Sequence, residues 1–268
     1  MDVDTESVLV ERSDGVGVVR LNRPDRLNAM TREMSLRYAS VMRELDRDPN
    51  VRVILVTGNG RGFCAGADLD VLGQDLLELS ECVPPIEDMP ALGFRLATPV
   101  VAAVNGPTAG VGFAYMLGAD VRFCSADAKI TTSFARLGLV AEYGLSWLLP
   151  RVVGLGRAMD LLLSGRTISG AEAGEMGLAE FVLPADEVFA AALAYARQIA
   201  AHCSPFSLEA IKGQVLSDST ADLDGALVRS RWLQERSFRG RDLRDSLATR
   251  TERRAPVIGR VPTGPTDV

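Results

Sequence analysis

Short runs of β-branched and apolar residues recur along the first half of the chain. They cover residues 16–21, 51–57, 99–104 and 120–124, and turn-forming residues end the first two. Unbroken apolar runs of about four to eight residues between turn signals are typical of strands buried in a sheet. The pattern therefore predicts buried strands at these positions.

Helical spacing of apolar residues appears between these runs. Residues 31–47 carry apolar positions on one helical face, with Thr31 suited to cap the start and Asp48, Pro49 and Asn50 to end it. The glycine-punctuated residues 110–118 are also compatible with a helix. Alternation of strand, helix and strand predicts an α/β fold with parallel strands and crossover helices.

The pattern becomes helical after Pro150. Helical spacing covers residues 151–165, 171–176, 186–201 and 208–216, and a short strand is predicted at residues 180–182. We predict an α/β core over residues 1–200 and a C-terminal helical region over residues 201–268, disordered beyond Pro256. Residues 72–92 mix acidic residues with prolines and predict a mobile loop or lid.

Composition is that of an ordinary globular protein. With 268 residues, 47% of them hydrophobic, the chain is long enough to bury one sizeable core. It has no uncharged apolar run of about 18 residues, and its first residues are acidic and polar. We therefore expect neither a transmembrane helix nor a secretory signal, no membrane partner, and a cytoplasmic location.

The sequence lacks the residues that several kinds of catalytic or binding site require. The four cysteines, Cys64, Cys82, Cys124 and Cys203, are widely scattered and are interpreted as reduced thiols. The single histidine, His202, lies at a predicted helix end and leaves little material for a metal site or a Ser-His-Asp triad. A net charge of −6 disfavours nucleic-acid binding.

Two glycine-rich segments follow predicted strands. They are GNGRGFCAGADL, residues 58–69, and NGPTAGVGF, residues 105–113. Open α/β folds bind ligands at this edge of the sheet, and glycines let the backbone approach a ligand closely. Two facing loops would offer amide groups to an anion, although such turns also occur for packing reasons. Neither segment is a nucleotide-phosphate loop, which disfavours ATP and NAD.

An ordered set of motifs resembles the crotonase superfamily, the enoyl-CoA hydratase/isomerase family, over roughly residues 5–255. The motifs are NRPDRLNAM (22–30), FCAGADL (63–69), PVVAAVNGPTAGVG (99–112), LLPRVVG (148–154) and LLLSGRTISGAEAGEMGLAEFVLP (161–184). The resemblance implies a crotonase-like spiral of ββα and βαβ turns and a C-terminal helical trimerisation region. It also implies an acyl-CoA substrate, no cofactor beyond the coenzyme A of that substrate, no metal, and a homotrimer or dimer of trimers.

The resemblance places an oxyanion hole at the backbone amides of Ala67 and Val111. Proton transfer beside a thioester, or addition to its conjugated double bond, puts negative charge on the carbonyl oxygen. Two preorganised donors at that oxygen are worth about 3 kcal/mol each or more. Further substrate or coenzyme A contacts are expected at Arg26, Leu27, Ala65, Asp68, Leu69, Phe134 and Tyr143, with Asp68 mainly shaping its loop and Arg26 near the phosphates.

The family's hydratases use two glutamates to hold water, and the matching positions here are Ala114 and Phe134. This disfavours the standard hydratase reaction. Glu142 stands where isomerase-like relatives carry a catalytic aspartate, among apolar residues that would raise its pKa towards neutrality. The alternative interpretation is that Glu142 caps a helix that begins near Gly144.

The leading hypothesis is an acyl-CoA double-bond isomerase in which Glu142 moves the proton. One alternative is a hydratase, hydrolase or lyase with an atypical site, the dehalogenase version being weaker. A second alternative, from a different class, is a non-catalytic acyl-CoA-binding protein or an RNA-binding protein, the latter disfavoured by the acidic charge.

Overall fold

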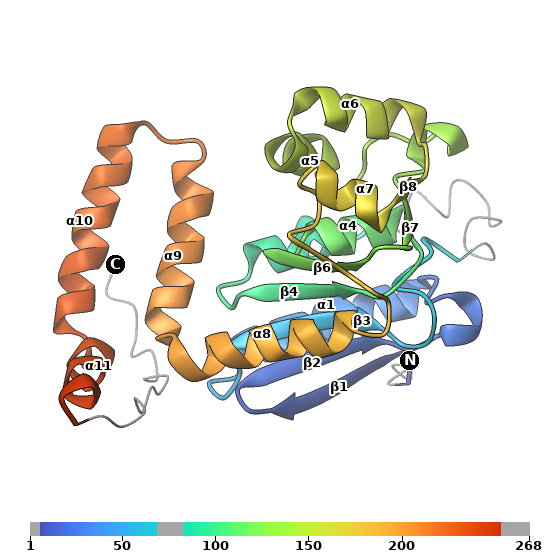
Figure 1. Cartoon of the computed structure of the whole chain (residues 1–268). Helices are drawn as coiled ribbons and strands as arrows, with labels where there is room; N and C mark the ends of the chain where they lie inside the picture. Colours follow the sequence, from blue (N-terminus) through green and yellow to red (C-terminus); the bar gives the residue numbers. More distant parts are fainter. Residues whose placement is uncertain (1–5, 69–82, 253–268) are drawn as a thin grey trace.

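The computed structural model describes residues 6–68 and 83–252 as an α/β fold (Figure 1). The strands are β1 (Val8–Ser13), β2 (Val16–Leu21), β3 (Val53–Gly58), β4 (Val100–Val104), β5 (Thr108–Ala109), β6 (Val121–Ser125), β7 (Lys129–Thr131), β8 (Ile168–Ser169) and β9 (Phe181–Leu183). The α-helices are α1 (Arg32–Arg47), α4 (Val111–Leu117), α5 (Leu145–Val153), α6 (Leu155–Ser164), α7 (Gly170–Glu175), α8 (Val188–His202), α9 (Pro205–Asp218), α10 (Leu223–Arg239) and α11 (Arg241–Glu252). The 3-10 helices are η1 (Pro24–Arg26), η2 (Ile86–Asp88), η3 (Pro90–Arg95) and η4 (Phe134–Leu137).

The larger sheet has the order β1-β2-β3-β4-β6-β9. All neighbours from β2 to β9 pair in parallel, as the alternating pattern predicts, and β1 alone is antiparallel. A smaller sheet, β5-β7-β8, was not predicted. Its strands are two or three residues long, too short for a periodic pattern to show.

The two faces of the larger sheet bury different helices. Alternate residues of β2, β3 and β4 face α1 and α4 on one side and α8 on the other, so most positions along these central strands are apolar. Small side chains of α8, namely Ala192, Ala196 and Ala200, lie against the sheet and allow close packing. Figure 1 shows α8 crossing one face of the sheet, and α5, α6 and α7 grouped beyond β6.

Local signals explain where the helices begin and end. Thr31 caps α1 as predicted, because its hydroxyl accepts a hydrogen bond from the Met34 N–H at 3.2 Å. The single helical stretch predicted over residues 151–165 is wrong in detail, since Gly154, with φ +83°, separates α5 from α6. His202 ends α8 with an exposed side chain, and Ser204 caps α9.

Two of the predicted features lie wholly or partly outside the described residues. Of the loop expected over residues 72–92, only residues 83–92 are described, and they form η2 and the start of η3. The segment beyond Pro256 is not described. Within residues 6–68 and 83–252, no helix is long and apolar enough to cross a membrane.

The C-terminal helices α9 and α10 pack against each other as an antiparallel pair beside the sheet (Figure 1). Lys212 of α9 joins this pair to the core. Its buried ammonium group donates to the carbonyl oxygens of Gly93 at 2.8 Å and Thr98 at 3.2 Å, and pairs with Asp120 at 2.7 Å. Asp120 also accepts the Val100 N–H at 2.7 Å. The assignment of residues 201–268 to oligomerisation stays a prediction.

Replacing Lys212 with methionine is expected to lower the free energy of unfolding by about 3 kcal/mol, because the largely buried Asp120 carboxylate would lose its partner. Denaturant unfolding measures this change. Lys129→Met is the control, since Lys129 is the only other lysine and its side chain is exposed. Equal stability of the two variants would contradict a structural role for the buried pair.

Candidate functional site

Three chain segments meet where the neighbouring strands β2, β3 and β4 end. Segment 27–30, which follows β2, pairs with segment 65–68, which follows β3. The Ala65 N–H donates to the Leu27 carbonyl at 3.0 Å, Met30 N–H to Gly66 at 2.8 Å, and Asp68 N–H to Met30 at 2.9 Å. Because these strands are parallel, all three segments lie at the carboxyl edge of the sheet.

The glycine-rich segment after β4 packs directly on the one after β3. The Ala109 N–H donates to the Cys64 carbonyl at 3.0 Å. Gly110 has φ +51° and turns the chain into α4, a conformation that favours glycine. A Cβ atom at Gly112 would lie 2.1 Å from the Cys64 carbonyl oxygen, so only glycine allows the segments to approach this closely.

Ala67 and Val111 present backbone N–H groups from these two segments. Met30 and Ala67 form a parallel β-bridge, whose hydrogen bonds use the Gly66 carbonyl and the Asp68 N–H. The Ala67 N–H therefore takes no part in the bridge. Val111 is the first residue of α4, where an N–H has no acceptor within the helix. Among the described residues neither group has an acceptor, so both are available to a ligand oxygen.

Gly112→Ala is expected to separate the two segments. Crowding against Cys64 should cost about 1–3 kcal/mol of stability and lower turnover, since it displaces the backbone on which Val111 stands. Thermal unfolding and kcat measure the two effects. Gly156→Ala is the control, because a Cβ atom there would meet no atom within 4 Å. Full activity of Gly112→Ala would contradict this role of the glycine.

Cys64 lies between the segments, but its thiol is not a candidate nucleophile. The side chain is fully buried, and burial raises the pKa of the Cys64 thiol to about 12. Cys64, Cys124 and Cys203 are free thiols, as predicted, and Cys82 lies outside the described residues.

Asp68 is a buried carboxylate held by two arginines. Its side chain is 2% exposed and pairs with Arg23 at 2.7 Å and with Arg26 at 3.1 Å. Arg23 also donates to the Ala29 carbonyl, which fixes the segment after β2. The sequence analysis predicted Arg26 and Asp68 as site residues but missed Arg23. Nothing in the sequence around Arg23 indicates which carboxylate it pairs with.

The bend that brings Leu27 to Ala65 depends on residues in the left-handed conformation. Leu27 has φ +50° and Asn28 has φ +58°. The buried Asn28 side chain donates to the Gly62 carbonyl at 2.8 Å and accepts the Arg23 N–H at 2.8 Å. Asparagine tolerates this conformation better than most residues. From the sequence, Asn28 is therefore recognisable only as a residue that favours turns. Leu69, the remaining residue predicted in this part of the site, lies outside the described residues.

Glu142 precedes α5 in a tight turn. The N-cap position is Gly144, and no side chain caps the helix; the Glu142 backbone carbonyl accepts the Leu145 N–H at 3.0 Å. The carboxyl is therefore not engaged as a helix cap. Burial raises the pKa of the Glu142 carboxyl, and a hydrogen bond from Tyr143 lowers it in part. A half-buried carboxyl with a raised pKa is suited to proton transfer.

Two aromatic pairs involve the part of the chain from η4 to α5. The Phe134 and Tyr143 rings lie 6.4 Å apart between centroids, and the Phe94 and Trp147 rings lie 6.3 Å apart. Helix α5 contacts α4, the helix that begins at Val111. The structure thus packs the helix that follows Glu142 against the helix that presents one of the two N–H groups. Ala114 is fully buried inside α4.

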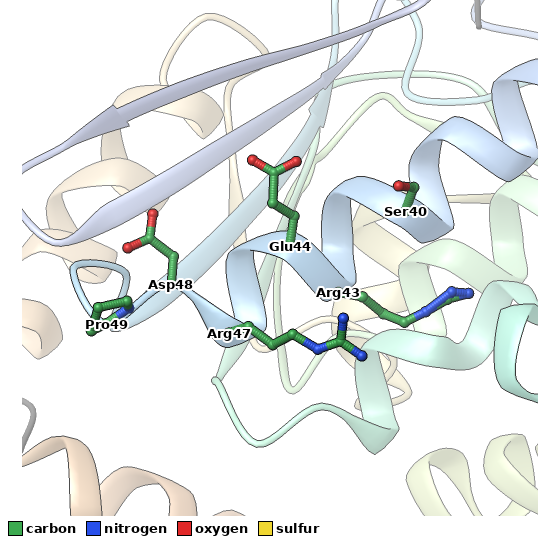
Figure 2. A pocket seen from close by; sticks show the side chains of 6 residues that line it. All are labelled: Ser40, Arg43, Glu44, Arg47, Asp48 and Pro49. Carbon is green, nitrogen blue, oxygen red and sulfur yellow. The ribbon is translucent and has the colours of Figure 1, made fainter. Parts of the chain in front are cut away.

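A hollow beside α1 is not part of this site. Figure 2 shows its lining residues: Ser40, Arg43, Glu44, Arg47, Asp48 and Pro49. Arg43 pairs with Asp88, and both Glu44 and Asp48 pair with Arg12. The hollow lies at the carboxyl end of α1. In sequence, α1 connects the parallel strands β2 and β3, so its carboxyl end leads into the amino end of β3. It therefore lies at the amino edge of the sheet, opposite the glycine-rich segments.

Metal ligands are not grouped in the described part of the chain. Within it, no three His, Cys, Asp or Glu side chains are placed so that they could hold a metal ion.

Comparison with known families gives one match over most of the chain. The sequence profile described as "Enoyl-CoA hydratase/isomerase" matches residues 11–260.

Individual relatives match this chain over nearly their full lengths. The Escherichia coli K12 protein named "1,2-epoxyphenylacetyl-CoA isomerase" is 35% identical, over 94% of this chain and 97% of its own. The Mycobacterium bovis protein named "Probable enoyl-CoA hydratase echA8" is 34% identical over the same shares. The crystal structure of a Bacillus anthracis enoyl-CoA hydratase superposes with a TM-score of 0.88 at 27% identity, covering 95% of this chain and all of the other.

Proposed function

The chain belongs to the enoyl-CoA hydratase/isomerase family and is an enzyme of the lyase or isomerase class, and from this premise we propose that it isomerises the double bond of an acyl-CoA thioester. In this proposal Glu142 is the proton carrier, and the Ala67 and Val111 N–H groups hold the thioester oxygen. The name of the E. coli relative, an isomerase, supports this choice of reaction class.

One observation carries the choice of isomerisation over hydration. The positions that match the hydratase glutamates hold Ala114, which is fully buried, and Phe134, which is 4% exposed. Neither side chain can bind or activate water. Glu142 supplies the acid or base near α4 in their place, and one carboxyl group is sufficient to take a proton from one carbon and return it to another.

The proposed reaction starts with the thioester oxygen between the two N–H groups. The Glu142 carboxylate removes a proton from C2 of a 3-enoyl thioester, and the electron pair forms an enolate whose charge lies on that oxygen. Protonated Glu142 then donates the same proton to C4, and the double bond moves to C2–C3. The free N–H groups favour this path because they stabilise the charge without rearrangement of the protein.

Coenzyme A enters only as part of the substrate in this proposal. Arg26 is half exposed and lies beside the Ala65–Leu27 pairing, where its guanidinium could meet a phosphate while Asp68 holds it in place. Leu27 and Ala65 would border the same moiety, and Phe134 and Tyr143 the acyl group.

The alternative is a hydratase with an atypical site, which the names of the mycobacterial relatives favour. Wild-type enzyme should be offered 3-hexenoyl-CoA for isomerisation, crotonyl-CoA for hydration and 1,2-epoxyphenylacetyl-CoA for ring isomerisation. We expect kcat/KM for isomerisation of 3-hexenoyl-CoA to exceed that for hydration and for ring isomerisation by about tenfold or more, that is, by about 1.4 kcal/mol of barrier. Faster hydration would overturn the proposed isomerase.

A further inference from the structure

The Ala67 N–H lies between two hydrogen bonds that join its segment to the segment after β2. On one side the Met30 N–H donates to the Gly66 carbonyl at 2.8 Å, and on the other the Asp68 N–H donates to the Met30 carbonyl at 2.9 Å. The direction in which the Ala67 N–H points is therefore set by the place of the segment that contains Met30.

Arg23 joins these two segments through one atom of its side chain. Its Nη1 nitrogen donates to the Ala29 carbonyl and, at 2.7 Å, to the Asp68 carboxylate. Ala29 directly precedes Met30 in one segment. Asp68 directly follows Ala67 in the other. Together with the backbone hydrogen bonds of Met30, the two side-chain contacts close a ring that includes Ala67.

Both ends of the contact between Arg23 and Asp68 are fixed. The Asn28 side chain accepts the Arg23 N–H at 2.8 Å, and the Asn28 N–H donates to the Arg23 carbonyl at 2.9 Å. The Asp68 side chain is only 2% exposed. Arg26 meets the other carboxylate oxygen at 3.1 Å from a half-exposed side chain, whereas Arg23 is 26% exposed. Arg23 is the more enclosed partner and the one that also holds Ala29.

The place of an oxyanion donor determines what it contributes. Its nitrogen must lie about 2.7–3.1 Å from the oxygen, and a displacement of about 1 Å can lower the rate about 10²-fold. We propose that Arg23 is a positioning residue that holds the Ala67 N–H where it donates to the thioester oxygen. It acts through Asp68 and Ala29 and has no contact with the reacting atoms. This inference rests on the proposed role of the Ala67 N–H.

The carbonyl stretching frequency of a bound thioester measures this placement. Hexanoyl-CoA has no double bond to move, and a ¹³C label at its thioester carbonyl isolates one band in difference infrared spectra. Hydrogen bonds to the oxygen lower the frequency, so binding to the wild type should lower it. Arg23→Gln should lose about half of this shift, because one of two donors is displaced. A full wild-type shift in Arg23→Gln would overturn the inference.

This readout separates positioning from a merely structural role. The band comes from bound ligand alone, so a smaller folded fraction of a destabilised variant leaves its frequency unchanged. Arg23→Lys should retain most of the shift, since one ammonium group has enough donors for both acceptors. A lysine variant that loses as much of the shift as Arg23→Gln would overturn the inference.

Arg12→Gln is the matched control. Arg12 also joins two segments, since it lies in β1 and pairs with Glu44 and Asp48 at the end of α1. These contacts lie at the amino edge of the sheet, away from the glycine-rich segments. Arg12→Gln should therefore keep the full frequency shift. A loss equal to that in Arg23→Gln would show that the shift does not report the Arg23 contacts, and the inference would fail.

Asp68→Asn tests the same contact from the other side, and it serves if Arg23→Gln does not fold. Asparagine has the shape of aspartate without its charge, so its hydrogen bond with Arg23 is weaker. This variant should lose part of the frequency shift. In its background, Arg23→Gln should lower kcat by a smaller factor than in the wild type, because contacting residues act through one interaction. A full shift in Asp68→Asn, or equal factors in both backgrounds, would overturn the inference.

Kinetics distinguish positioning from substrate binding. Arg23→Gln should lower kcat for 3-hexenoyl-CoA about 10–10²-fold, because the donor is displaced in the transition state. KM should stay within about threefold. A raised KM with unchanged kcat would indicate that Arg23 binds the substrate directly, and the positioning role would be wrong.

The two proposals fail separately. If bound hexanoyl-CoA shows no lowered carbonyl frequency in the wild type, the proposed oxyanion hole fails whatever Arg23 does. If the wild type shows the shift and Arg23→Gln retains it in full, only the positioning role fails.

Discussion

Replacing Glu142 with glutamine is expected to lower kcat for isomerisation of 3-hexenoyl-CoA about 10²–10⁴-fold, the usual contribution of a positioned acid or base. Glutamine has nearly the same shape, but it cannot take a proton. Because the change affects the transition state and not the bound substrate, KM and the Kd for coenzyme A thioesters should stay within about threefold. Steady-state kinetics and calorimetry measure the two quantities.

The matched control for this substitution is Glu187→Gln, which changes an exposed glutamate just before α8. It should leave kcat unaltered. Tight binding with wild-type turnover in Glu142→Gln would show that another group carries the proton.

Val111→Pro is expected to lower kcat about 10²–10³-fold, the usual effect of removing one oxyanion donor. Proline lacks the N–H that we propose donates a hydrogen bond to the thioester oxygen. Val111 is the first residue of α4, a position where proline fits a helix. Gly110 has ψ −117°, outside the helical region that a following proline disfavours. The backbone should therefore tolerate the change.

Val111→Ala is the control for this second prediction, since it shortens the same side chain and keeps the N–H. Its kcat should exceed that of Val111→Pro by about 10²-fold. Circular dichroism and thermal unfolding check that both variants fold. Similar rates in the two variants would show that the Val111 N–H does not stabilise the transition state.

Much of the fold could be predicted from apolar periodicity. Strand β2 has the predicted bounds, and β3, β4 and β6 differ from theirs by one or two residues. These strands are buried on both faces, so their sequences are largely apolar, with Arg20 in β2 and Arg122 in β6 as charged exceptions. Strand β1 was missed because the second half of VLVERS is polar and exposed at the edge of the sheet.

The glycine-rich segments that form the backbone of the site could also be predicted from the sequence. Gly110 and Gly112 mark places where a turn or a close approach excludes a side chain. The pairing of segment 65–68 with segment 27–30 was not accessible, because hydrogen bonds between distant segments leave no periodic signal. The same holds for Arg23 with Asp68, and for Lys212 with Asp120, which lie far apart in sequence.

The conformation of Tyr143 was equally hidden. Tyrosine rarely adopts positive φ, so the sequence gives no sign of the left-handed turn that follows Glu142. The contact expected between Tyr143 and the substrate stays a prediction.

The most direct test of the central claim is a crystal structure of the enzyme with acetoacetyl-CoA bound. We expect the thioester oxygen to lie about 2.7–3.1 Å from the N–H nitrogens of both Ala67 and Val111. We also expect the Glu142 carboxylate to face C2 within about 3.5 Å. A thioester oxygen bound elsewhere, or Glu142 turned away from C2, would rule out the proposed mechanism.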